Sequence, residues 1–130
     1  MKKNIFFGAI SIIVIGAGLW VWSSAEQAKN AAPTQVTGDT IFFFGQECPH
    51  CLDVEKFIAD NKIADKVKYD SLEVWHNNAN MDLMTKKAKE CGLSSDQIGV
   101  PLVFSKGKCY VGTPDAEKFF QDAANQAAAQ

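Results

Sequence analysis

Arginine is absent from this sequence, and all 13 basic side chains are lysines. From Asp39 onward the chain has 10 lysines and 14 acidic residues, which gives this part a formal net charge of 10 − 14 = −4. A nucleic-acid-binding surface needs clustered lysine and arginine side chains. We therefore expect no nucleic-acid partner for this protein.

Length and cysteine content set two further limits. The 130 residues are enough for one domain of ordinary size and too few for a multidomain enzyme. Four cysteines are too few for a miniprotein held together mainly by disulfides. Nine phenylalanines and three tryptophans argue against intrinsic disorder of the central part.

The sequence has one long apolar run, at its N-terminus. The 18 positions from Ile5 to Trp22 contain Ser11 as their only polar side chain, and Lys2 and Lys3 precede them. A helix of this length spans about 27 Å, close to the roughly 30 Å thickness of the hydrocarbon layer. The lysines favour a cytoplasmic N-terminus. We therefore expect residues 1–22 to be a transmembrane anchor that leaves the rest of the chain outside the cytoplasm.

Cleavage of this segment is the competing interpretation. Residues 23–25, Ser-Ser-Ala, would satisfy a signal-peptidase site, but the apolar run is longer than the core of most signal peptides, so we favour an uncleaved anchor. Residues 23–38 are small, polar and aperiodic and are predicted to form a linker. We expect the folded domain to span residues 39–124, followed by a short tail at 125–130.

The apolar pattern beyond the linker predicts alternating strands and helices. Continuous apolar positions favour buried strands, and apolar positions three and four apart favour helices. The predicted elements are a strand at 40–44, a helix from 49 to about 61, a strand around 67–72, a helix from about 77 to 90, a hairpin of 100–104 and 108–111, and a helix from 113. This β-α-β-α-β-β-α order implies an α/β fold with a mixed four-stranded sheet and helices on both faces.

Cys48-Pro49-His50-Cys51 lies where a buried strand gives way to a helix. We expect a reachable Cys48 at the N-cap, where free backbone N–H groups and the helix dipole stabilise a thiolate. Cys51 follows one turn later, shielded from solvent but close enough to attack a mixed disulfide. Pro49 stiffens the turn, and the His50 imidazole can stabilise the thiolate, which makes the disulfide more oxidising. Glu47 opposes thiolate formation to a small degree, and the motif as a whole predicts a catalytic dithiol–disulfide pair.

Cys-Pro-His-Cys after a phenylalanine-rich strand resembles the active site of DsbA-type disulfide oxidases in the thioredoxin-like superfamily. The domain size and the downstream pattern are more similar to glutaredoxins. Residues 99–104, Gly-Val-Pro-Leu-Val-Phe, match the glutaredoxin Thr-Val-Pro loop and following strand, and residues 111–115 match loosely the Gly-Gly-x-x-Asp turn. The resemblance covers about Thr40 to Phe120 and implies a thioredoxin-like domain of glutaredoxin size.

The resemblance also assigns roles to the loop before the third strand. It implies that Pro101 follows a cis peptide bond and faces the cysteines, and that the Val100 backbone holds an extended substrate segment; a trans proline in an ordinary loop is the alternative. Two features depart from the family pattern. Phe42 stands where thioredoxin and DsbA-type proteins have a buried acid, and Gly45 and Gln46 stand where glutaredoxins have a basic residue for glutathione. We therefore do not extend glutathione binding to this chain.

Cys91 and Cys109 leave two interpretations open. Cys91 continues an apolar helical stripe and Cys109 lies in a predicted strand, and both positions are typical of buried free thiols. Unpaired thiols are disfavoured in an oxidising compartment, and a structural Cys91–Cys109 disulfide would contribute roughly 3 kcal/mol to stability. His76 lies in a polar, asparagine-rich stretch and is interpreted as an ordinary loop residue.

These observations predict a membrane-tethered, extracytoplasmic thiol-disulfide oxidoreductase that forms or exchanges disulfides in exported proteins. Cys48 is the nucleophile, Cys51 resolves the mixed disulfide, and a membrane redox partner recycles the pair without a diffusible cofactor. We favour an oxidase; a reductase or isomerase supplied by a membrane electron donor is the alternative. A metal-binding module that uses the same cysteines for zinc or copper is an alternative of another class, although a structural zinc site needs about four ligands.

Overall fold

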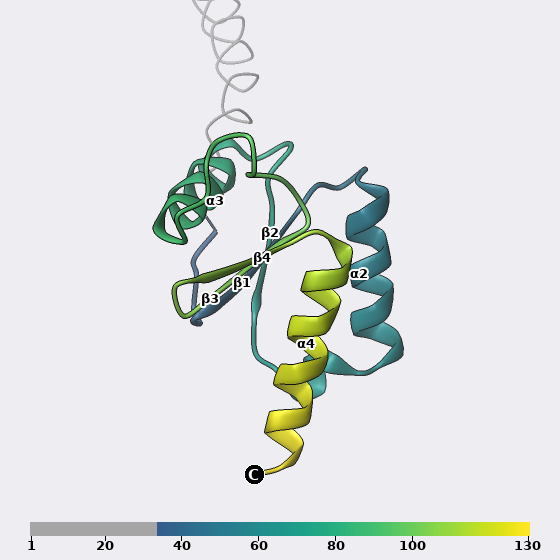
Figure 1. Ribbon diagram of the computed structural model, residues 1–130. Helices are drawn as coiled ribbons and strands as arrows, with labels where there is room; N and C mark the ends of the chain where they lie inside the picture. Colours follow the sequence, from purple (N-terminus) through teal and green to yellow (C-terminus); the bar gives the residue numbers. More distant parts are fainter. Residues whose placement is uncertain (1–33) are drawn as a thin grey trace, which may run out of the picture. The chain divides into compact units, whose positions relative to one another are not determined.

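The computed structural model describes residues 34–130 (Figure 1). The predicted anchor at 1–22 and the predicted linker up to residue 33 lie outside the described residues. Between residues 34 and 130, no helix combines the length and the apolar content needed to cross a membrane.

Four strands and three α-helices alternate along the described chain. Their order is β1 (Thr40–Phe44), α2 (Pro49–Asp60), a short 3-10 helix η2 (Ile63–Asp65), β2 (Asp70–Glu73), α3 (Asn78–Glu90), β3 (Leu102–Ser105), β4 (Lys108–Val111) and α4 (Thr113–Ala128). This sequence of elements confirms the predicted β-α-β-α-β-β-α order.

The strands form one mixed sheet in the order β2-β1-β3-β4. β1 runs parallel to β2 and antiparallel to β3, and β3 pairs with β4 as an antiparallel hairpin. Figure 1 shows α2 and α4 together on one face of the sheet and α3 on the other. The predicted four-stranded sheet with helices on both faces is confirmed.

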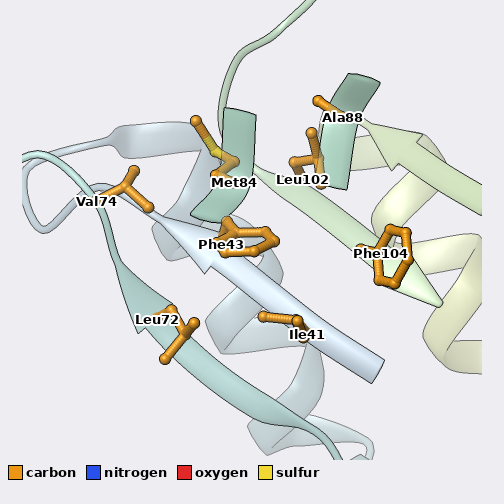
Figure 2. Packing of buried hydrophobic residues seen from close by; sticks show 8 residues of the cluster. All are labelled: Ile41, Phe43, Leu72, Val74, Met84, Ala88, Leu102 and Phe104. Atoms are coloured by element: carbon orange, nitrogen blue, oxygen red, sulfur yellow. The ribbon is translucent and has the colours of Figure 1, made fainter. Parts of the chain in front are cut away.

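β1 is buried on both faces because it lies inside the sheet and has helices above and below it. Ile41 and Phe43 belong to the cluster beneath α3, whereas Phe42 belongs to the cluster beneath α2 and α4. Figure 2 shows the cluster beneath α3, which consists of Ile41, Phe43, Leu72, Val74, Met84, Ala88, Leu102 and Phe104. Burial on both faces explains why a continuous apolar run encodes this strand.

Three element boundaries differ from the predicted ones. β2 begins at Asp70, because Val67 still belongs to the turn after η2, where its N–H donates to the Ile63 carbonyl at 2.8 Å. β3 begins after Pro101, since proline has no N–H for the strand ladder. α4 continues to Ala128 and so includes most of the predicted tail.

The last residues of the predicted linker are hydrogen-bonded to the domain. The Thr34 N–H donates to the Asn80 side chain at 3.2 Å. The Asp70 carboxylate accepts the N–H groups of Gly38 and Thr37 at 2.9 and 2.8 Å and also the Thr37 hydroxyl. These bonds hold the pKa of Asp70 below its ordinary value. The ordered part of the chain therefore begins before residue 39.

A disulfide between Cys91 and Cys109 links the C-terminal end of α3 to strand β4. Cys91 is the C-cap of α3, and Cys109 lies in β4, with 5.8 Å between their Cα atoms. The bond closes a loop with a sequence separation of 18 residues. The sequence left open whether these cysteines are free thiols or a disulfide, and in the structure they form the disulfide.

Removing this disulfide is expected to destabilise the domain. Closing a loop of this length lowers the chain entropy of the unfolded state, so Cys91→Ala/Cys109→Ala should lose about 3 kcal/mol in the free energy of unfolding. Urea titration of oxidised protein measures the loss. A Cys48→Ser/Cys51→Ser background is the control, because the 91–109 bond is then the only one that a reductant can open. An unchanged unfolding midpoint on reduction of that variant would contradict the expectation.

Candidate active site

Cys48 lies at the N-cap of α2, after a short turn that follows β1. Its backbone N–H donates to the Gly45 carbonyl at 3.1 Å, which closes the turn. Pro49 takes the first helical position, where no backbone donor is needed. The strand, turn and helix therefore bring the Cys48 side chain to the free N–H groups of the first helical turn.

The two sulfurs of the motif have different surroundings. The Cys51 backbone N–H donates to the Cys48 sulfur at 3.2 Å, and an amide directed at sulfur stabilises negative charge on it. Cys51 is fully buried, and this burial, together with the hydrogen bond to Cys48, raises the pKa of its thiol to about 12. Cys51 therefore keeps its proton at neutral pH, whereas Cys48 has the environment of a nucleophile.

Cys48 is more enclosed than its predicted role suggests. Only 4% of the residue is exposed, although Pro49 and His50, which follow it, are both exposed. The cause is local: the sulfur accepts the Cys51 N–H and so faces the first turn of α2 instead of the solvent. The exposed surface next to this sulfur in the chain is formed by Pro49 and His50.

The Pro101 loop meets the motif through the start of α4. The Val100–Pro101 peptide bond is cis, and the Pro101 carbonyl accepts the Gly112 N–H at 2.9 Å. The Thr113 hydroxyl in turn donates to the His50 carbonyl at 3.2 Å. Since Phe43 pairs with Leu102 in antiparallel register, Pro101 lies opposite the end of β1. The Pro101 loop is therefore linked to the motif through Gly112 and Thr113, whereas Cys91 and Cys109 form a separate disulfide.

Phe42 fills the position at which the family resemblance implies a buried acid. Its side chain is 1% exposed, and its ring packs against Phe44 and Phe120 with centroid distances of 5.9 and 6.0 Å. This aromatic cluster offers no group to accept the Cys51 proton. Glu55, one turn after Cys51 on α2, adds negative charge that raises the pKa of Cys51 further.

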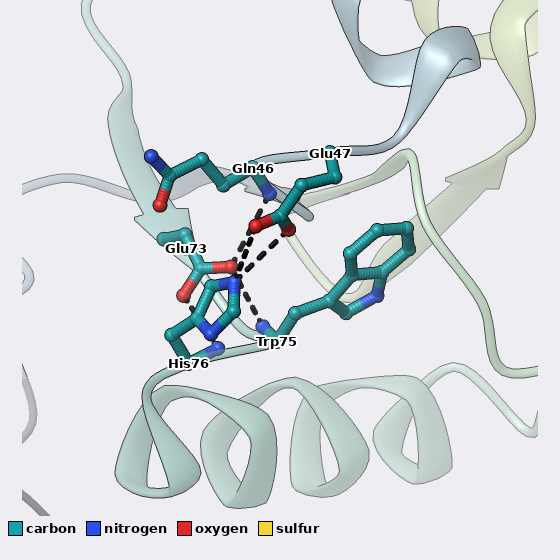
Figure 3. Close-up of polar contacts among 5 residues, drawn as sticks. All are labelled: Gln46, Glu47, Glu73, Trp75 and His76. Atoms are coloured by element: carbon teal, nitrogen blue, oxygen red, sulfur yellow. Dashed lines mark hydrogen bonds and ion pairs between the residues drawn. The ribbon is translucent and has the colours of Figure 1, made fainter.

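Glu73, at the end of β2, accepts three backbone hydrogen bonds near the motif (Figure 3). Its carboxylate accepts the backbone N–H groups of Trp75 and His76 at 2.8 and 2.9 Å and that of Gln46 at 3.3 Å. These hydrogen bonds tie the loop after β2 to the turn that leads from β1 into α2, and they hold the pKa of Glu73 below its ordinary value. Glu73 was not among the predicted site residues.

His76 lies in the loop after β2, as predicted, and its imidazole has a partner that the sequence did not indicate. Its Nε2 lies 2.8 and 2.9 Å from the two carboxylate oxygens of Glu47, the residue before Cys48 (Figure 3). The hydrogen bond and the charge of Glu47, with a smaller effect of Glu73, raise the pKa of His76. Protonated His76 therefore offsets the negative charge of Glu47. The parallel pairing of β1 with β2 makes the residues after both strands neighbours, and this pairing is not visible in the local sequence.

Trp75 lies across the backbone of Gly45. A Cβ at Gly45 would come within 2.3 Å of the indole ring, so only glycine fits at this position without moving the ring. Despite this contact, Trp75 is 47% exposed. A large aromatic surface is thus held beside the turn that carries Cys48.

Metal-ligating side chains do not converge in the part of the chain that the structure describes. Between residues 34 and 130 there is no group of three or more histidine, cysteine, aspartate or glutamate side chains that could hold a metal ion.

No family model matches this chain, and no curated protein matches it. Among solved structures, oxidized glutaredoxin 2 from Chlamydomonas reinhardtii is 20% identical over 71% of this chain and 84% of that chain, with a TM-score of 0.49. The holo form of glutaredoxin C1 from Populus tremula x tremuloides is 21% identical over 83% and 89%, with a TM-score of 0.48. The buckwheat glutaredoxin–glutathione complex is 19% identical over 82% and 89%, with a TM-score of 0.47. Because these similarities are low, the description of the fold relies on the strand order and strand directions of this chain.

The unequal sulfurs predict selective alkylation. At pH 8 a thiol with a pKa of about 12 is ionised in about one molecule in 10⁴, so iodoacetamide should label Cys48 and leave Cys51 unlabelled in the reduced protein. Mass mapping of the labelled peptides distinguishes the two cysteines. In Cys48→Ser, labelling within the motif should nearly cease, and labelling of both cysteines at equal rates would contradict the prediction.

The His76–Glu47 pair predicts a pH dependence. Because the pKa of His76 is raised in the folded state, the pair stabilises the fold fully below the unfolded-state pKa, and this contribution disappears as the pH rises through the folded-state pKa. NMR titration of the imidazole should show the raised pKa in the wild type and a return toward the ordinary value in Glu47→Gln. Asp82→Asn, which removes an exposed acid on α3, is the control. An identical His76 titration in Glu47→Gln would exclude the pair in solution.

Proposed function

We propose that this protein is a thiol-disulfide oxidoreductase in which Cys48 exchanges disulfides with substrates and Cys51 is its disulfide partner, which can also resolve a mixed disulfide at Cys48. The observation that carries the proposal is the hydrogen bond of 3.2 Å from the Cys51 N–H to the Cys48 sulfur at the start of α2. A sulfur at this position gains an amide donor and the positive end of the helix dipole, while its partner waits one turn away. The Pro101 loop beside the motif offers a surface for the substrate.

Substrate oxidation needs two exchange steps. A substrate thiolate attacks the Cys48 sulfur of the 48–51 disulfide, a new substrate–Cys48 bond forms, and Cys51 leaves with the electron pair and takes up a proton. A second substrate thiolate then attacks the substrate sulfur of the mixed disulfide, and Cys48 leaves as a thiolate. The substrate dithiol has lost two electrons, which the reduced cysteine pair holds until a membrane redox partner accepts them.

The difference between the two sulfurs supports the oxidase direction. Cys48 is the better leaving group, since the Cys51 amide stabilises its thiolate, and its departure completes substrate oxidation. The reductase direction requires Cys51 to lose a proton from a thiol whose pKa is about 12, with Phe42 in place of an acid that could accept it. His50, adjacent to the nucleophile, adds a group that can favour the thiolate.

The proposed location is the outer side of a membrane, with exported proteins as substrates. The apolar run from Ile5 to Trp22 and the lysines before it carry this part of the proposal. The Cys91–Cys109 disulfide supports it independently, because structural disulfides persist in oxidising compartments and are rare where glutathione and thioredoxin keep thiols reduced.

Cysteine variants test the exchange mechanism. Cys48→Ser should lower the rate of oxidation of a reduced, unfolded substrate protein by at least about 100-fold, because no 48–51 disulfide then exists for the substrate thiolate to attack. When Cys51→Ser is mixed with a disulfide-bonded substrate, the Cys48 thiolate should attack the substrate disulfide and accumulate as a mixed disulfide, visible on non-reducing gels. Cys91→Ser/Cys109→Ser is the control, since it also replaces cysteine by serine but leaves the 48–51 pair in place, and it should retain exchange. Full turnover by Cys48→Ser would refute the proposal.

The reduction potential of the 48–51 pair tests the direction separately. An oxidase should equilibrate with glutathione at a potential near that of DsbA, about −120 mV, whereas a reductase should lie near thioredoxin, about −270 mV. A value in the thioredoxin range would overturn the oxidase direction and leave the exchange mechanism intact.

A further inference from the structure

One carboxylate holds the two segments that carry charge beside the motif. Glu73, at the end of β2, accepts the Gln46 N–H at 3.3 Å and the His76 N–H at 2.9 Å (Figure 3). Gln46 directly precedes Glu47, so the backbones of Glu47 and His76 are held relative to each other. The contact between the His76 Nε2 and the two Glu47 oxygens, at 2.8 and 2.9 Å, therefore forms between segments that are already in place.

The Glu47 carboxylate is near enough to the Cys48 sulfur to change the energy of a charge on it. The two residues are neighbours in the chain, so bond lengths alone keep carboxylate and sulfur within roughly 10 Å of each other. The Debye length at 0.1 M salt is also about 10 Å, so salt does not screen this interaction completely. A negative charge at such a distance disfavours a thiolate.

The protonation state of His76 determines whether this charge is compensated. When the imidazole is protonated, its pair with Glu47 has no net charge. When the imidazole is neutral, Glu47 carries an uncompensated negative charge next to Cys48. The contact with Glu47 raises the pKa of His76, so the imidazole stays protonated to a higher pH than an unpaired histidine.

The elements around His76 contribute further charges. Glu47, from the turn before α2, is its main partner, and Glu73, from β2, adds a smaller attraction. α3 begins two residues after His76, and the positive end of its dipole opposes the imidazolium, whereas Asp82 is an exposed acid further along α3. The attraction by the two glutamates prevails, since the pKa of His76 is raised. The other imidazole near the motif, His50, is exposed on α2 and titrates separately.

We infer that His76 is a positioning residue for the exchange reaction: it binds the Glu47 carboxylate and, when protonated, cancels an opposing charge beside the Cys48 sulfur. A stabilised Cys48 thiolate stabilises the dithiol form, so the 48–51 disulfide is a stronger oxidant when His76 is protonated than when it is neutral. The pH thus regulates the oxidising strength of the pair through a residue outside the motif. The inference rests on the proposed thiol-disulfide exchange and adds its regulation.

The experiment measures the equilibrium of the full-length protein, in detergent micelles, with glutathione. Two glutathione thiols reduce the 48–51 disulfide and become joined as glutathione disulfide, and the equilibrium constant of this reaction is compared between variants at each pH. At about pH 6 the constant of the wild type should exceed that of His76→Gln by about two- to fourfold, the effect of one unit charge at roughly 10 Å. At about pH 9, where the imidazole has lost its proton, the ratio should fall to about one.

His76→Lys gives a rescue that a merely structural role would not give. Lysine keeps its positive charge up to about pH 10. The constant of His76→Lys should therefore equal that of the wild type at about pH 6 and exceed it by about two- to fourfold at about pH 9.

Glu47→Gln tests whether His76 acts through Glu47. Removing the carboxylate should raise the constant at about pH 9 by about two- to fourfold, because no charge is then left to compensate. At about pH 7, where an unpaired imidazole is mostly neutral, adding His76→Gln to Glu47→Gln should leave the constant unchanged.

Lys66→Gln is the matched control, because it also removes one positive charge from an exposed position. Lys66 lies beyond the far end of α2, a helix of 12 residues and about 18 Å, so its distance from the sulfur exceeds the Debye length. Its constant should equal that of the wild type at every pH.

The outcomes separate a failure of this inference from a failure of the proposed function. The inference is wrong, and the proposed function stands, if the wild type equilibrates with glutathione but matches His76→Gln at every pH. It is also wrong if Lys66→Gln lowers the constant as much as His76→Gln, or if His76→Gln has the same effect with and without Glu47. If the wild type neither reacts with glutathione nor oxidises dithiothreitol, both the proposed function and the inference fail.

Discussion

The candidate site depends on one hydrogen bond, the contact between the Cys51 amide and the Cys48 sulfur at the first turn of α2. Its geometry is set by elements that are themselves rigid. β1 is buried on both faces and fixes where the preceding turn begins, and Pro49 fixes where the helix begins. This contact stabilises charge on Cys48, whereas burial raises the pKa of Cys51 and keeps its thiol protonated, so the two sulfurs are unequal.

Charge around the motif is balanced by residues from a neighbouring strand. Glu47 brings a negative charge next to the nucleophile, and His76 binds both of its carboxylate oxygens. Glu73 holds the loop that carries His76 through two backbone hydrogen bonds, and a third, from the Gln46 N–H, ties this loop to the turn before α2. A site that has Phe42 in place of a buried acid thus has a paired Glu47 and His76 at the surface beside the motif.

Local patterns were enough to predict the order of elements and the cysteine motif. The apolar run of β1 and the alternation of strands and helices are properties of short segments, so they could be recognised without tertiary information. The role of His76 could not, because it depends on which strands are neighbours. The pairing of Cys91 with Cys109 stayed open for the same reason: it requires the end of α3 to meet β4, and no residue near either cysteine encodes that contact.

The hydrogen bonds of residues 34–38 determine where a fragment that contains only the domain should begin. A fragment beginning at the predicted boundary, residue 39, would remove every donor that the Asp70 carboxylate uses, and it would also remove the Thr34 partner of Asn80. Asn80 is 2% exposed and also donates to the Glu73 carbonyl. A fragment that lacks residues 34–38 would therefore lose contacts that hold β2, the strand that ends at Glu73. A fragment that contains the whole domain should begin upstream of Thr34.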